Sequence, residues 1–92
     1  MTRDAIGEGI FAIVARTFDA DAADFDETTT ADDVDGWDSL AHATLLIRIE
    51  KRFNVDLGPA GSEAQDLGAL IDLVDRRLGD GPQDDAQDGP RS

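Results

Sequence analysis

The sequence predicts an all-α domain of three main helices and one short helix, with a long loop between the first two main helices. Three stretches space their apolar residues by three and four positions, as amphipathic helices do. The first two stretches are separated by residues 19–38, which show no helical period. A chain of 92 residues is enough for one small domain.

The first helix is expected from Thr2 to Phe18, with Thr2 or Asp4 capping its start. Its apolar stripe consists of Ile6, Ile10, Phe11, Ile13, Val14 and Phe18. The loop that follows, residues 19–38, is rich in acids, and Gly36 and three successive threonines break any helical period. A loop of this length in a compact domain tends to be functional. We expect it to be attached to the helices by Phe25, Val34 and Trp37.

The second main helix is expected from Ser39 to Phe53 and has the clearest pattern in the chain. Asp38 stands where an N-cap residue belongs, and Asn54 follows the last helical residue. The apolar face recurs every four residues and consists of Leu45, Ile49 and Phe53, with Leu46 beside them.

The remaining sequence predicts a connector, a short helix and a final long helix. Residues 55–59 suggest an extended connector, followed by a short helical turn over residues 62–65. The last helix is expected to start with Asp66 as its N-cap and to end at Gly79. Its core face consists of Leu67, Leu70, Ile71, Val74 and Leu78. Residues 1–79 then form the folded domain, and residues 80–92, with almost no apolar content, form a disordered acidic tail.

The composition excludes several classes of partner. With 21 acidic and 8 basic residues the net charge is −13, which disfavours binding to nucleic acid or to an anionic membrane surface. There is no cysteine and therefore no disulfide or thiolate zinc site, and we expect no other metal site. No membrane span or secretory signal is apparent, which favours a cytoplasmic protein. We expect a monomer.

One serine stands where chemistry is plausible: Ser39 begins the second main helix directly after the acidic loop. A serine hydroxyl is a weak nucleophile without a base, and the only histidine is His42, three residues later. Ser39 is better interpreted as an acceptor that another enzyme modifies. A phosphate ester there would lie beside the free N–H groups of a helix start, which favour an anion.

The motif Asp38-Ser39-Leu40, followed by Leu45 and the rest of that apolar face, resembles the acyl carrier protein family over roughly residues 6–78. The resemblance implies a four-helix bundle in which residues 1–79 are the carrier domain. It implies that a phosphopantetheinyl transferase, using coenzyme A and magnesium, attaches 4'-phosphopantetheine to Ser39, between Asp38 and Leu40. The arm would hold an acyl group as a thioester, and the carrier itself would catalyse nothing.

The second main helix departs from the acidic pattern usual in fatty-acid carriers. After Asp38 it holds one acid, Glu50, against Arg48, Lys51 and Arg52. This favours a discrete carrier of polyketide, antibiotic or other specialised biosynthesis over general fatty acid biosynthesis. Its partners would be acyltransferase, ketosynthase or acyl- or aminoacyl-loading enzymes.

The docking surface is expected on the same helix. Ile47 lies off the apolar face and should be at least partly exposed. The resemblance implies that the second helix offers an apolar residue to partners at this point, so we expect Ile47 and Leu40 to contact partner enzymes. Arg48 and Trp37 are further docking candidates, although Trp37 also suits a packing role.

Other interpretations remain open at this point. An aminoacyl or peptidyl carrier shares the fold and the arm, and an unmodified helical adaptor would share the fold alone. A small hydrolase would use Ser39 with His42 as its base. A calcium site in the acidic loop is disfavoured, because the spacing of its acids fails the EF-hand pattern after Asp24.

Overall fold

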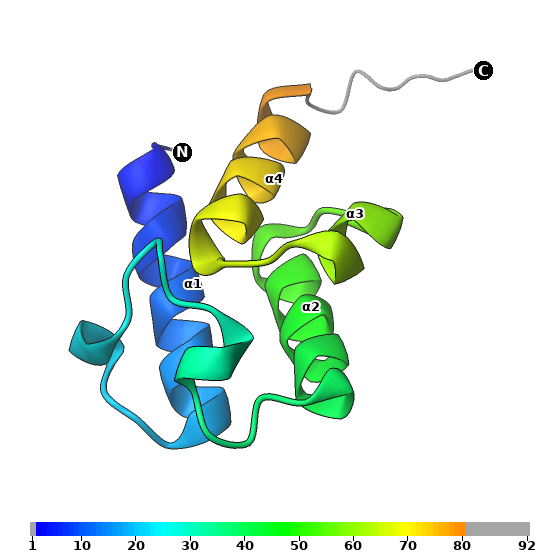
Figure 1. Cartoon of the computed structure of the whole chain (residues 1–92). Helices are drawn as coiled ribbons and strands as arrows, with labels where there is room; N and C mark the ends of the chain where they lie inside the picture. The colour runs from blue at the N-terminus through cyan, green and yellow to red at the C-terminus, as the bar shows by residue number, and fades with distance from the viewer. Residues whose placement is uncertain (1, 81–92) are drawn as a thin grey trace.

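The computed structural model describes residues 2–80, which form an all-α fold with four helices (Figure 1). The helices are α1 (Arg3–Phe18), α2 (Ser39–Phe53), α3 (Gly58–Glu63) and α4 (Leu67–Asp80). Two short 3-10 turns, η1 (Ala22–Asp24) and η2 (Ala31–Asp33), lie in the loop between α1 and α2. The predicted fold of three long helices, one short helix and a long first loop is confirmed.

The core lies where α1, α2 and α4 meet, and α1 packs against both of the other long helices. Most of its members are residues that the periodic pattern predicts, and Leu57 of the connector and Leu73 of α4 join them. The buried apolar cluster consists of Ile6, Ile10, Val14, Leu45, Ile49, Phe53, Leu57, Leu67, Leu70, Ile71, Leu73 and Val74. No helix within residues 2–80 is long and apolar enough to cross a membrane.

Local sequence fixes the ends of the long helices. The Thr2 side chain accepts a hydrogen bond from the Ala5 N–H at 3.1 Å, and so it caps α1. Helices α1 and α2 both end on a residue in the left-handed region, Asp19 at φ 54° and Asn54 at φ 55°. Aspartate and asparagine tolerate this conformation better than most side chains, which is why the helices stop there.

Two predicted boundaries are wrong. The short helix covers Gly58–Glu63 rather than residues 62–65, because Pro59 suits the first turn of a helix and Gly61 lets α3 pack closely on Leu46. Helix α4 does not end at Gly79 but continues to Asp80, since a glycine within a helix costs only about 1 kcal/mol. Asp80 thus belongs to α4, and the rest of the predicted tail lies outside the described residues.

The acidic loop is fastened to the start of α4, which the sequence did not reveal. The first N–H groups of α4 donate to loop carbonyls, Leu67 to Thr29 at 3.0 Å and Gly68 to Glu27 at 2.8 Å. These N–H groups have no partner inside their own helix, so the loop supplies one. Two of the three predicted anchors, Phe25 and Trp37, also pack against the core.

Candidate functional site

Ser39 is exposed and is the first residue of α2. Asp38 caps the helix, its Oδ1 accepting from the Ala41 N–H at 2.9 Å and its carbonyl accepting from the His42 N–H at 2.9 Å. Because Asp38 satisfies those two donors, the N–H groups of Ser39 and Leu40 remain as the other donors of the first turn. The helix start therefore offers donors and a favourable field to an anion joined to Ser39.

A tight turn at the end of the loop places Ser39 at the start of α2. Gly36 has φ 87°, a conformation that glycine adopts without strain, and its carbonyl accepts from the Asp38 N–H at 3.0 Å. Trp37 then turns inward and contacts Phe18 at the end of α1, with 5.3 Å between ring centroids. Trp37 is half-buried, and its packing holds the chain in place directly before the Asp38 cap.

His42 has a structural role that sequence reasoning missed. Its Nδ1 accepts from the Trp37 Nε1–H at 3.0 Å, and its Nε2 lies 3.0 Å from the Gly61 carbonyl. Since Nδ1 accepts, Nε2 carries the proton and donates to Gly61. His42 is half-buried and joins the loop to α2 and α3. Both ring nitrogens are engaged, so neither is left to activate Ser39, and the hydrolase interpretation loses its base.

A shallow hollow of about 460 Å³ lies beside Ser39, between the loop, α2 and α3. Its walls are formed by small, polar and aromatic side chains, and it is open to solvent. The lining residues are Ala31, Trp37, Asp38, Ser39, His42, Ser62 and Ala64. The hollow gives an arm attached at Ser39 a surface to lie against, but it has no enclosed cavity for a cargo.

Two large apolar side chains of α2 face solvent. Leu40 is 77% exposed and Ile47 is 54% exposed. They are seven residues apart and so lie on the same face of the helix. The predicted exposure of Ile47 is confirmed, and the face that it shares with Leu40 begins next to Ser39. Their contact with partner enzymes stays a prediction.

Arg48 lies on the side of α2 that faces α1. Its Nη1 donates to the Thr17 Oγ1 at 2.9 Å, which links the two helices. Trp37 and Arg48, the two other docking candidates, thus each have an intramolecular contact. Of the predicted site residues, the structure brings Asp38, Ser39 and Leu40 together and places Ile47 on the face of Leu40.

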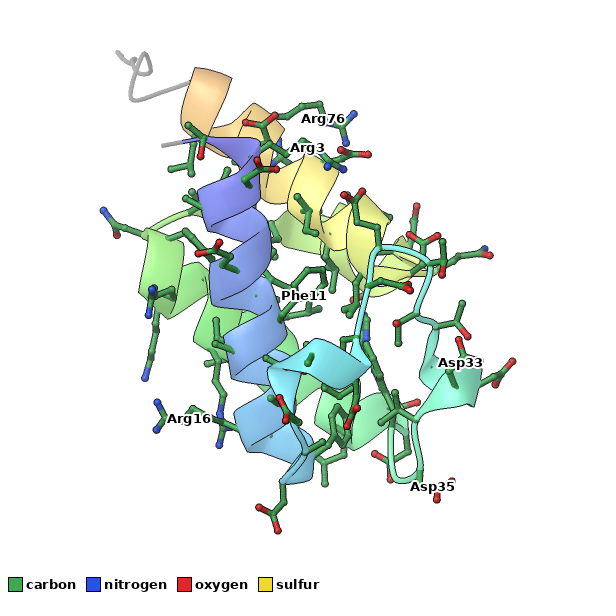
Figure 2. The ribbon with its side chains drawn as sticks, turned by 90° about the vertical axis from the view of Figure 1, so that its left-hand side faces the viewer. Arg3, Phe11, Arg16, Asp33, Asp35 and Arg76 are labelled. Carbon is green, nitrogen blue, oxygen red and sulfur yellow. The ribbon has the colours of Figure 1, made fainter. Side chains whose placement is uncertain are left out.

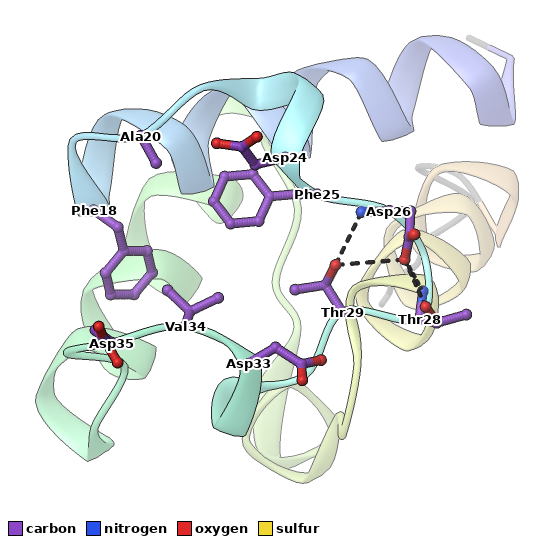
Figure 3. A pocket seen from close by; sticks show the side chains of 10 residues that line it. All are labelled: Phe18, Ala20, Asp24, Phe25, Asp26, Thr28, Thr29, Asp33, Val34 and Asp35. Atoms are coloured by element: carbon purple, nitrogen blue, oxygen red, sulfur yellow. Dashed lines mark hydrogen bonds between the residues drawn. The ribbon is translucent and has the colours of Figure 1, made fainter.

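The acidic loop and the end of α1 line a second, open hollow, whose walls combine Phe18, Phe25 and Val34 with several carboxylates (Figure 3). Asp26 Oδ1 accepts from the Thr28 hydroxyl at 2.6 Å and from the Thr28 N–H at 2.8 Å. The hydroxyl bond is the main cause that lowers the pKa of Asp26 below its usual value. Asp26 therefore shapes a turn. Within residues 2–80 no group of three or more potential ligand side chains is placed to hold a metal ion.

Comparison with protein-family models gave no match, and comparison with curated protein sequences gave none either. Among solved structures, the chain is similar to holo acyl carrier protein from Geobacter metallireducens, determined by solution NMR. The TM-score is 0.71 at 30% sequence identity, and the match covers 94% of this chain and 95% of that chain.

Likeness over nearly the full length of both chains defines the class of protein, because it includes all four helices and the long first loop. This chain belongs to the acyl carrier protein family. The fold is that of a carrier protein, and the family resemblance inferred from the sequence is confirmed.

Proposed function

We propose that this chain carries an acyl intermediate as a thioester on a 4'-phosphopantetheine arm attached to Ser39. The observation that supports this most directly is the position of Ser39, which is exposed at the first turn of α2 and directly follows Asp38, the residue that caps the helix. A second support is the solved similar chain, which is the holo form of an acyl carrier protein.

The residues around Ser39 suit such a group. The phosphodiester of the arm would be a permanent anion, and the first-turn N–H groups of Ser39 and Leu40 would stabilise it. Asp38, which caps the helix, would hold the serine hydroxyl at a fixed place for a phosphopantetheinyl transferase. When bound, the arm supplies the thiol that this cysteine-free chain lacks.

The pathway is proposed to be a specialised one, such as polyketide biosynthesis. After Asp38, helix α2 carries Glu50 against three basic residues, so its surface differs from the acidic helix on which general fatty-acid enzymes dock. Dedicated acyltransferase, ketosynthase or loading enzymes would contact Leu40 and Ile47, the exposed apolar residues beside the arm.

The attachment is tested by intact-protein mass spectrometry after incubation with coenzyme A, magnesium and a broad-specificity phosphopantetheinyl transferase. Wild type should gain one phosphopantetheine and Ser39→Ala should gain none. Ser62→Ala is a matched control, because Ser62 is an exposed serine of the same hollow, and it should be modified like wild type. Modification of Ser39→Ala, or none of wild type, would refute the proposal.

The cargo is tested separately. Mass analysis of the protein isolated from its native host, before and after treatment with hydroxylamine, should show an acyl group released from a thioester. An amino-containing group would instead establish the aminoacyl or peptidyl carrier.

A further inference from the structure

Four basic side chains of α1 and α2 surround a hollow of about 490 Å³. We call them, with Ile13, which also lines the hollow, the basic patch. Half of the 8 basic residues of the chain are found here. The members are Ile13, Arg16, Arg48, Lys51 and Arg52. Figure 2 shows Arg16 at the far end of α1 from Arg3.

The charges of the basic patch are not neutralised within the part of the chain that the structure describes. Over residues 2–80 the ion pairs are those of Arg3 with Glu27 and Asp72, so the basic patch has no carboxylate within 4.0 Å. Four like charges around one hollow repel one another. Although the net charge of the chain is −13, these four cations have no acid beside them. An acidic ligand bound at the basic patch would relieve their mutual repulsion.

The basic patch continues the exposed face that begins at Ser39. Lys51 follows Ile47 by four residues, and Ile47 follows Leu40 by seven, so the three share one side of α2. From Ser39 to Arg52 the helix rises about 20 Å. A protein that contacts the arm at Ser39 can therefore cover Leu40, Ile47 and the basic patch with one continuous surface.

We propose that the basic patch docks an acidic segment on the surface of a partner enzyme, while Leu40 and Ile47 cover an apolar spot on the same partner. The proposal depends on the proposed function in one respect only, because it takes the partner to be an enzyme that acts on the arm. A protein segment is favoured over nucleic acid or an anionic membrane, because an extended polyanion would also meet the repulsion of the −13 chain. The complementary charges would speed the encounter and set its orientation.

The probe is a short synthetic amphipathic peptide with Glu at its polar positions and Leu at its apolar ones, titrated into the full-length 15N-labelled protein. Amide shifts should concentrate at Arg16 and along α2 from Ile47 to Arg52, and affinity should fall as salt is added. Arg52→Glu should weaken binding by about tenfold. The same peptide with Lys in place of Glu should not bind.

The matched control is Arg76→Glu, which makes the same change in charge at the opposite end of the molecule from Arg16 (Figure 2). It should change affinity by less than about twofold, since the distance exceeds the screening length. Equal weakening by both variants would show that only net charge matters and would overturn the proposal. If Arg52→Glu fails to fold by circular dichroism, the milder Lys51→Gln with Arg52→Gln makes the same test.

Two further outcomes would assign the basic patch elsewhere and overturn the proposal. Neutralising the tail with Asp84→Asn, Asp85→Asn and Asp88→Asn would shift the Arg48 and Arg52 amides if the chain's own tail occupies the patch. Binding to phosphatidylglycerol vesicles that is lost in Arg52→Glu would indicate a lipid surface. Neither the peptide nor the vesicles need the arm, so failure of modification at Ser39 leaves this test independent.

Discussion

At the scale of single residues, His42 shows how one side chain fixes the position of Ser39. It accepts from Trp37 and donates to the Gly61 carbonyl, so it ties the loop that precedes Ser39 to both α2 and α3. These bonds use up the two ring nitrogens. A histidine three residues from a serine is therefore part of the support of the site and not its base.

Replacing His42 with Ala should lower the free energy of unfolding by about 1–3 kcal/mol, because it removes two hydrogen bonds and leaves the Trp37 Nε1–H without its partner. Urea unfolding followed by the fluorescence of Trp37, the only tryptophan, measures this. The control is Thr44→Ala, which removes only a bond from the Thr44 hydroxyl to the Leu40 carbonyl within the same helix. Equal losses in the two variants would contradict the role of His42.

The residues that could be predicted from the sequence act over short distances along it. Thr2, Asp38 and Asp66 each cap a helix through a bond to the N–H three residues ahead, so the local pattern is enough to find them. The bond from His42 to Gly61 spans 19 positions. It exists only because α3 packs beside α2, which no local pattern reports.

At the scale of elements, two glycines of α1 illustrate how closely the helices approach. A methyl group at Gly9 would lie 2.8 Å from the Phe53 ring of α2, closer than carbon atoms can pack. A methyl group at Gly7 would lie 3.4 Å from the Ile71 side chain of α4, which is an ordinary contact. Gly9 is thus required by the packing of α1 on α2, whereas Gly7 is not.

The two substitutions should therefore change stability in opposite directions. Gly9→Ala should destabilise the protein by about 1–3 kcal/mol, because the Phe53 ring must move out of its place in the core. Gly7→Ala should stabilise it by up to about 1 kcal/mol, because alanine favours the helix and fits the space. Thermal unfolding of both variants beside wild type gives the signs. A gain in Gly9→Ala would mean that the helices lie farther apart.

Periodicity predicts the long helices well, because the spacing of their apolar residues marks the buried face, as Leu45, Ile49 and Phe53 do in α2. It fails for α3 because that helix is short and buries chiefly Gly61, which has no side chain to contribute to a pattern. It also missed the attachment of the acidic loop, because the bonds from α4 go to backbone carbonyls of Glu27 and Thr29. Any residue type presents the same carbonyl.

At the scale of the whole molecule, charge is distributed unevenly. Acids dominate the chain, and the basic patch gathers cations in one place on α1 and α2. Arg3 alone bridges distant acids in the described part of the chain, contacting Glu27 of the loop and Asp72 of α4 at 2.7 Å each. The hydrogen bond from Arg3 is the main cause that lowers the pKa of Glu27.

The family could be inferred from the sequence because the motif, the chain length and the order of the helices agree. The basic patch could not be predicted in full, because it forms only when the fold brings Arg16 of α1 beside α2.

This distribution predicts how salt affects stability. Both the general repulsion of a −13 chain and the repulsion within the basic patch are screened by salt, whereas the ion pairs of Arg3 are the main attraction that salt weakens. We expect the repulsion to outweigh this attraction, so the midpoint of thermal unfolding should rise by a few degrees between about 0.01 M and 0.15 M salt.

Arg3→Gln separates the two contributions. It should have a lower midpoint at low salt and a steeper rise with salt than wild type, because it no longer has ion pairs to lose. Arg76→Gln makes the same change in net charge without touching those pairs, so it should rise less steeply than Arg3→Gln. A midpoint that falls with salt in wild type would mean that the bridge made by Arg3 between α1, the loop and α4 outweighs the repulsion of the whole chain.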